Sequence, residues 1–295
     1  MPTDDILIVT NGTKESYPAI EQGAWLAATL DSPITLLGVT ERQDPAAIDS
    51  IHPLENVFEK AVGVFEAQGL KYQLEVRNGS AEKIVVMEAK QHDSIVVLGP
   101  LGRPQLQRWM TGRSIRTFIE DIEQPLLYVP ETKLPVKKIL ISVGGLGYDV
   151  TAEHLAMQVA AKCGAEVAFL HIVPPIDLDY PTAKAMSRNW QNLTETDTPV
   201  GRSLRKSLEN ARGAGLAASV KVRHGNVIEE ILAEMRNGNH DLLCMGSSYS
   251  VHSLRQMYSA NVTAEIMDHA VCPVMTARFR SAADVLPWHP PPGQV

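Results

Sequence analysis

The chain has 295 residues, a mass of 32.3 kDa and a formal net charge of −7 at pH 7. This length favours two domains, and 44% hydrophobic with 21% charged residues is typical of globular chains rather than disordered ones. The acidic balance argues against a nucleic-acid-binding protein, as does an aromatic content of 5%, which leaves few rings for base stacking. The negative excess lies in residues 1–135, which hold 12 basic and 19 acidic residues, whereas residues 136–295 hold 15 of each.

Membrane, secreted and disulfide-rich classes are also disfavoured. No uninterrupted apolar run approaches the roughly 18 residues of a membrane-spanning helix, and residues 1–5 are acidic where a secretory signal would be basic. The three cysteines, Cys163, Cys244 and Cys272, are too few for a disulfide framework and do not have the spacing of metal ligands. We therefore expect a cytoplasmic protein that binds neither membranes nor nucleic acids.

In the first half of the chain, short β-branched apolar segments alternate with longer amphipathic ones. Strands are predicted at residues 6–10, 34–39, 72–76, 94–98 and 126–129. Helices are predicted at residues 15–30, 56–68, 81–91 and 114–123. This alternation predicts an α/β fold in which helices cover both faces of a parallel sheet. The near-continuous apolar character of the strands favours burial on both sides.

The second half of the chain repeats the first. Residues 5–10 return as 138–143, and residues 69–70 and 76–79 return as 215–216 and 222–225. His92-Asp93 matches His240-Asp241, and residues 124–129 match 271–276. The offset grows from 133 to 146, which places an insertion of about a dozen residues between Pro174 and Pro199. Matched segments in one order predict two copies of one unit, residues 1–135 and 136–280, followed by a Pro-rich tail at 281–295.

The richest glycine pattern follows the fourth predicted strand. Gly99 and Gly102 are separated by two residues, and Gly102 and Gly112 by nine. The pattern begins at the end of a strand and finishes at the start of a helix, where backbone amides and a helix N-terminus form an anion site. Residues 99–119 contain four arginines and no acidic residue. The segment therefore predicts a phosphate-binding loop, although the glycines could also do no more than shape a turn.

This glycine pattern, on a five-stranded βα unit that ends in a Pro-led strand, resembles the universal stress protein family. The resemblance covers essentially the whole chain, as a tandem pair. It implies that each copy is a doubly wound, Rossmann-like sheet of order 3-2-1-4-5, of the adenine nucleotide alpha hydrolase type. The ligand crevice is then expected at the carboxyl ends of strands one and four, where the strand order reverses.

For function, the resemblance implies a stress-response protein whose first copy binds ATP or a related adenine nucleotide, with or without Mg²⁺, and which acts as a nucleotide-dependent sensor or regulator. Its implied ligand positions are Asn11, Gly12, Thr13, Val39, Gly99, Gly102, Arg103, Gly112, Arg113 and Ser114.

The first copy departs from the family pattern at two of these positions. ATP-binding members usually carry Asp where this chain has Asn11, and Ser or Thr directly after the third glycine, where it has Arg113 followed by Ser114. Asn keeps an acceptor for the adenine but loses the charge, and Arg is a capable phosphate ligand. The site is thus altered rather than deleted.

The second copy departs further. Gly246 is retained, but Tyr249 replaces the second glycine, and Ser259 or Ala260 replaces the third, depending on which match sets the register. Gly144 stands at the adenine-contacting position. A side chain where the backbone must approach a phosphate is a steric obstacle. We therefore expect the second site to be degenerate.

Three functional hypotheses follow. The sequence contains no Gly-x-x-x-x-Gly-Lys-Ser/Thr motif, no His-Glu-x-x-His motif and no pairing of a nucleophile with a base. Nucleotide binding without catalytic or metal-binding residues is therefore the leading hypothesis, favoured by the three glycines and the arginines. A protein-interaction scaffold with two vestigial pockets and an unknown protein partner is the second, favoured by Asn11 and Arg113. Slow ATP hydrolysis is the third and weakest.

The fifth predicted strands, residues 126–129 and 274–276, are edges in the implied strand order. Both are apolar and have no lysine, and exposed edges of this kind tend to pair. The linker at residues 130–136 is short, and dimers of the family place their fifth strands against each other across a two-fold axis. We therefore expect a pseudo-dimer within one chain, and leave open its further association into a homodimer.

Overall fold

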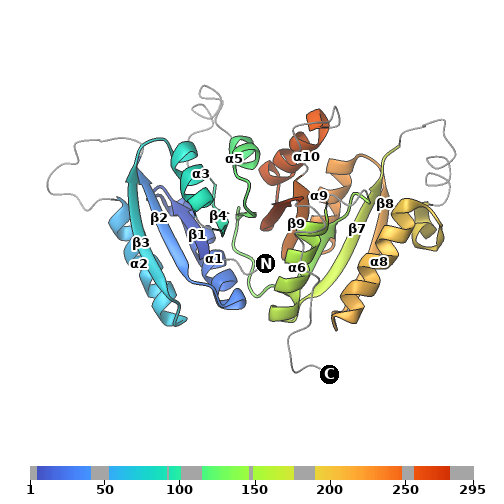
Figure 1. The fold of residues 1–295 in the computed structure, drawn as a ribbon, viewed down its shortest axis with the longest axis horizontal. Coiled ribbons are helices and arrows are strands. Elements are labelled where there is room, and N and C mark those ends of the chain that lie inside the picture. The colour runs from blue at the N-terminus through green and yellow to red at the C-terminus, as the bar shows by residue number, and fades with distance from the viewer. Residues whose placement is uncertain are drawn as a thin grey trace. The chain divides into compact units, whose positions relative to one another are not determined.

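A computed structural model of the chain describes residues 5–40, 53–91, 93–100, 115–145, 149–175, 190–247 and 256–279. The chain divides between Leu134 and Pro135 into two compact units. Each unit is an α/β structure with helices on both faces of its strands (Figure 1).

The first unit contains five strands in the order β3-β2-β1-β4-β5, with parallel pairing throughout. Helices α1 and α2 pack together, as do α3 and α5. The strands are β1 (Asp5–Thr10), β2 (Ile34–Thr40), β3 (Tyr72–Asn78), β4 (Ser94–Leu98) and β5 (Leu126–Tyr128). The helices are α1 (Tyr17–Leu30), α2 (Pro53–Ala67), α3 (Ala81–Gln91) and α5 (Ile115–Asp121), and a 3-10 turn, η1 (Lys14–Ser16), precedes α1.

The core of this unit lies along β1, β2 and β4, whose residues are nearly all buried. The expectation that every strand is buried on both sides is wrong for β3. Its Leu74 and Val76 are 42% and 53% exposed. The reason is its position at the edge of the strand order, where it has one neighbouring strand instead of two.

The second unit repeats this architecture, with the order β10-β9-β6-β7-β8. If the strands of each copy are numbered from one to five along the chain, both units have the order 3-2-1-4-5. The predicted fold is therefore confirmed. The strands are β6 (Lys138–Ser142), β7 (Glu166–Val173), β8 (Ala218–His224), β9 (Leu242–Ser247) and β10 (Val274–Arg278). The helices are α6 (Val150–Cys163), α8 (Pro199–Gly213), α9 (Val227–Asn237) and α10 (Gln256–Asp268), and the short η2 (Trp190–Glu195) lies in the insertion before α8.

The strand register shows that the predicted match of His92-Asp93 with His240-Asp241 is wrong by one residue. β4 pairs with β1 through Ile95, and β9 pairs with β6 through Leu242 at the equivalent position. His240 therefore repeats Asp93 and not His92. The turn before β9 carries one residue more than the turn before β4.

Within the described ranges, no helix is both long and apolar enough to cross a membrane.

Candidate functional site

A pocket lies at the carboxyl ends of β1 and β4. In the observed order β1 lies between β2 and β4, so the strand order reverses at this point. Ligands of doubly wound sheets bind in the crevice at such a reversal. The pocket is lined by Val9, Thr10, Asn11, Ser16, Val39, Ala81, Leu98, Gly99, Pro100 and Phe118.

The pocket brings together three of the predicted ligand positions, Asn11, Val39 and Gly99. Gly12 and Thr13 follow Asn11 in the loop between β1 and α1. The other five predicted positions lie outside the described residues: Gly102, Arg103, Gly112, Arg113 and Ser114.

The loop between β1 and α1 is held by hydrogen bonds among its own residues. The backbone N–H and the hydroxyl of Thr13 both donate to Asn11 Oδ1, at 3.2 and 2.8 Å. The Gly12 N–H donates to Thr10 Oγ1 at 3.1 Å, and the Thr10 and Ser16 hydroxyls are 2.7 Å apart. Gly12 has a φ of 81°, a left-handed conformation that glycine adopts without strain. The loop therefore has its shape without a ligand.

Gly99 is required by packing at the end of β4. A Cβ atom at this position would lie 2.9 Å from the carbonyl oxygen of Glu15 and 3.4 Å from the Cα of Ser16. The absent side chain lets β4 end directly against the loop between β1 and α1. Packing alone is thus a sufficient reason for glycine here, without a ligand role.

Sequence reasoning missed the two buried hydroxyls of this pocket. Thr10 is 2% exposed and Ser16 is 4% exposed. A local signal existed for Thr10, a polar residue at the end of an apolar strand and directly before Asn11. The cavity enclosed by the lining is about 60 Å³, room for about two water molecules. A nucleotide is larger than this cavity, so the residues that line it could form only one end of a nucleotide site.

Charges near the pocket are mixed. A hydrogen bond from its own backbone N–H lowers the pKa of the Glu15 carboxyl, which stays ionised and opposes an anion at this loop. Arg116, the member of the arginine group within the described residues, forms an ion pair with Glu120 at 2.6 Å. This pair is exposed and therefore weak, so it offsets only part of the charge of Arg116.

The equivalent end of the second copy has different chemistry. The Gly144 N–H, two residues after the end of β6, donates to Oδ2 of the buried Asp149 at 2.7 Å. This backbone donor is therefore already used within the protein. His171 Nδ1 donates to Val143 O at 2.7 Å, and burial lowers the pKa of the ring, which is therefore neutral. Gly145 lies against Val200 of α8.

Within the part of the chain that the structure describes, no three His, Cys, Asp or Glu side chains are grouped to hold a metal ion.

Comparisons with known proteins agree with the repeat and the fold. The model of the Universal stress protein family matches residues 2–130 and again residues 135–278. A universal stress protein from Mycolicibacterium smegmatis is 24% identical over 93% of this chain and 97% of its own length, and one from Synechocystis is 20% identical over 93% and 99%.

Solved structures are similar over the same extent. A universal stress protein from Archaeoglobus fulgidus has a TM-score of 0.67 at 18% identity, covering 94% of this chain and 97% of its own. A putative universal stress protein from Pseudomonas aeruginosa has a TM-score of 0.61 at 13% identity, covering 93% of both chains. Such identities show a shared fold. With the family model matched twice, the chain belongs to the universal stress protein family, of which it is a tandem member.

Proposed function

We propose that the first copy binds an adenine nucleotide such as ATP, and that the chain acts as a nucleotide-dependent sensor or regulator in a stress response. One observation carries the proposal. Asn11, Val39 and Gly99, which the family resemblance implies as ligand positions, line one pocket where the strand order reverses. They belong to three segments that are distant in the sequence and converge only in the folded unit.

Each of these residues has a role that suits a nucleotide. Asn11 Oδ1 accepts from Thr13, so the group that Asn11 would offer to adenine is its amide N–H, as a donor to a ring nitrogen. Val39 and Phe118, each 2% exposed, supply apolar surface for the base. The glycine-rich segment that starts at Gly99 supplies backbone amides for phosphate.

A protein-interaction scaffold is the second candidate, and specific observations favour it. The acceptor of Asn11 is already used within its own loop. Gly99 is explained by its contact with Glu15, and the described cavity is small. In this candidate both pockets are vestigial and the surface of the chain recognises an unknown protein partner.

We propose that the second copy does not bind the nucleotide. Gly144 is the equivalent of Asn11, the position implied to contact adenine, and its amide already donates to the buried side chain of Asp149. Binding is therefore expected at one site per chain, without turnover.

Titration calorimetry of the full chain with ATP tests the proposal. We expect a stoichiometry near one, and loss of binding in Gly102→Val and in Gly112→Val, since a side chain in either place keeps phosphate from the backbone. Gly144→Val is the matched control in the second copy, because a Cβ at Gly144 meets nothing within 4 Å. It should bind ATP as the parent does.

The outcomes separate the candidates. Two equal sites, or binding that survives both glycine substitutions, would contradict the proposal. No detectable heat at millimolar ATP would support the scaffold instead. Release of inorganic phosphate during the titration would contradict binding without turnover.

A further inference from the structure

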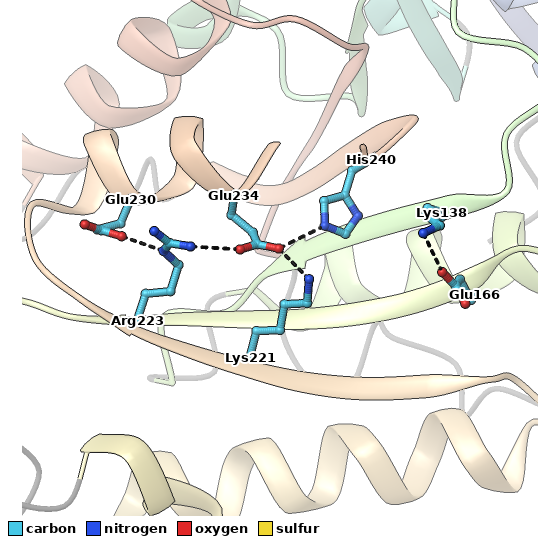
Figure 2. Close-up of polar contacts among 7 residues, drawn as sticks. All are labelled: Lys138, Glu166, Lys221, Arg223, Glu230, Glu234 and His240. Carbon is cyan, nitrogen blue, oxygen red and sulfur yellow. Dashed lines mark hydrogen bonds and ion pairs between the residues drawn. The ribbon is translucent and has the colours of Figure 1, made fainter. Parts of the chain in front are cut away.

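The edge strand β3 of the first unit carries two exposed apolar side chains. Leu74 is 42% exposed and Val76 is 53% exposed. Their direction follows from Arg77, which forms an ion pair with helix α3, as Arg223 of β8 does with Glu234 of α9 (Figure 2). Successive side chains of a strand point to opposite faces, so Leu74 and Val76 point away from α3. We call the surface that these two side chains form the β3 face.

Helix α2 packs on the same side of the sheet as the β3 face. The Tyr72 ring of β3 lies 5.5 Å from the Phe65 ring of α2. Gly38 of β2, which pairs with Val76, lies under the Phe58 ring, since a Cβ atom on Gly38 would be 2.9 Å from Phe58 Cζ. Helix α2 therefore borders the β3 face on the side of β2. On its other side the face has no neighbouring strand within the described sheet, because β3 is last in the strand order.

The border that α2 gives to the β3 face is acidic. The Tyr72 hydroxyl donates to Glu66 Oε1 at 3.2 Å, so Glu66 lies on the side of α2 that faces β3. Glu59 and Glu55 precede it by seven and eleven residues, about two and three helical turns, so they lie on the same side. All three side chains are exposed. The single lysine of α2, Lys60, lies over an aromatic ring of α1 and so is directed away from β3.

In the second unit, the insertion covers the equivalent face. Val222 of β8 occupies the position of Val76, and the short η2 packs against both β8 and α8. Leu193 of η2 is fully buried, and the Trp190 ring is 5.8 Å from the ring of His224 at the end of β8. Val222 is half-buried, although β8 is an edge strand as β3 is. An aromatic side chain and a leucine, three residues apart, thus cover this face in the second copy.

The helix beside the covered face carries the opposite charge. Helices α2 and α8 both have 15 residues and begin with proline, and the seventh residue is Glu59 in α2 and Arg205 in α8. Arg205 Nη1 donates to the carbonyl oxygens of Thr194 and Thr196, at 2.5 and 2.8 Å. The covering segment is therefore held by apolar contacts and by a positive side chain of α8. The first copy has a similar apolar strand surface with a carboxylate at the equivalent position.

We propose that the β3 face binds a short amphipathic segment of a partner protein. An aromatic and a leucine side chain of this segment lie on Leu74 and Val76, and its lysine or arginine side chains lie beside Glu55 and Glu59. Such a segment is a counterpart of η2 with basic side chains. Carboxylates repel nucleic acids and anionic lipids, so a basic protein segment is the class of partner that this border favours. None of these residues lines the pocket at β1 and β4, so the inference does not depend on nucleotide binding.

Fluorescence anisotropy of two labelled peptides, titrated with the full chain, tests the proposal. The basic peptide has the sequence of residues 190–198 with Thr194→Lys, Glu195→Gln, Thr196→Lys and Asp197→Asn. The acidic peptide has glutamate in place of the two lysines and is otherwise identical. We expect saturable binding of the basic peptide at one site per chain, because the second copy covers its own face. The acidic peptide should bind at least about tenfold more weakly, since like charges at the border select against it.

Four variants of the chain locate the site. Glu59→Arg, which copies Arg205, should weaken binding of the basic peptide at least about tenfold and strengthen binding of the acidic one. Val76→Gln, at an exposed position that tolerates change, should weaken binding of the basic peptide at least about fivefold. The matched controls are Met87→Gln, 47% exposed on α3, and Glu123→Arg, at an exposed position after α5. Both should leave binding unchanged.

Four results would overturn the proposal. They are the absence of saturable binding of the basic peptide, equal binding of the two peptides, unchanged binding in Glu59→Arg or Val76→Gln, and a loss in either control variant as large as the loss in Val76→Gln. The last result would place the peptide on another surface of the chain.

Discussion

Glu153 is a buried carboxyl on α6 and is 6% exposed. The equivalent position of α1 holds Ile20, which is 1% exposed. The second copy therefore has an ionisable side chain where the first copy has an apolar core side chain. Burial raises the pKa of Glu153 to about 7, and the nearby Asp149 acts in the same direction. The Ser207 hydroxyl donates to Glu153 Oε2 at 3.0 Å and opposes part of this shift.

Glu153→Gln should therefore stabilise the protein in a pH-dependent way. The folded pKa of about 7 exceeds the ordinary value of 4.5, so the folded state holds this proton more tightly and the free energy of unfolding falls as pH rises between these values. The free energy of unfolding falls by at most about 3 kcal/mol through this group, and the fall is complete once the pH is above the folded pKa. Glutamine does not ionise, so urea unfolding should show a larger gain over the parent at pH 8 than at pH 5.

The control for this prediction is Glu166→Gln, since the Glu166 side chain is 55% exposed. Its effect on unfolding should be the same at both pH values. An equal effect of Glu153→Gln at pH 5 and pH 8 would mean that the carboxyl titrates normally.

At the level of elements, the insertion of the second copy builds the beginning of α8. Thr198 Oγ1 accepts from the Gly201 N–H at 3.1 Å and caps the helix. Thr196 Oγ1 donates to Leu193 O at 2.7 Å, and Leu193 of η2 is fully buried. A Cβ atom on Gly201 would collide with the carbonyl oxygens of Leu193 and Thr196. The insertion thus packs closely on the first turn of the helix.

Gly201→Ala should destabilise the chain by about 2 kcal/mol, because the new methyl group forces η2 away from α8. Gly213→Ala, at the last residue of the same helix, is the matched control. A Cβ there meets nothing within 4 Å, so the change should be neutral or stabilising by up to about 1 kcal/mol. Thermal unfolding measures both, and equal midpoints for the two variants would refute the packing argument.

Over the whole molecule, the duplication preserved a scaffold contact while the candidate sites diverged. Arg77 of β3 pairs with the buried Glu88 of α3 at 2.9 Å, and Arg223 repeats the contact with Glu234 at 3.1 Å. These pairs join an edge strand to a helix in each unit. The carboxyl-end loops and the faces bordered by α2 and α8, in contrast, differ between copies in side-chain size and charge.

The association of the two units stays a prediction. The linker is tied to the first unit, since Thr132 Oγ1 donates to Glu21 Oε2 at 2.8 Å and the Lys133 N–H donates to Gln22 Oε1 at 3.1 Å. A protease site inserted between Leu134 and Pro135 should therefore be cleavable without disturbing these contacts.

After cleavage we expect the halves to co-elute from a sizing column, because each fifth strand is an apolar edge that would otherwise be open. The uncut chain with the same insertion is the control, and its elution volume also reports any homodimer. Separate elution of two soluble halves would contradict the pseudo-dimer.

Sequence patterns alone predicted most of the fold. The strand from Ser94 to Leu98 and the helix from Ala81 to Gln91 have the predicted bounds. The repeat predicted two copies of one unit, and the family resemblance implied the strand order that both units have. This worked because β-branched apolar runs, helical spacing and internal matches are properties of contiguous residues, which a sequence displays directly.

The exposure of side chains and the positions of cavities depend on the tertiary structure. β3 is exposed because of its place at the edge, although its own residues are partly apolar. Thr10 and Ser16 meet across a loop, and the pocket at the ends of β1 and β4 is lined by Asn11, Val39 and Gly99, which come together only after the sheet has formed. A cavity is the volume left between side chains from separate elements, so no local pattern in the sequence encodes it.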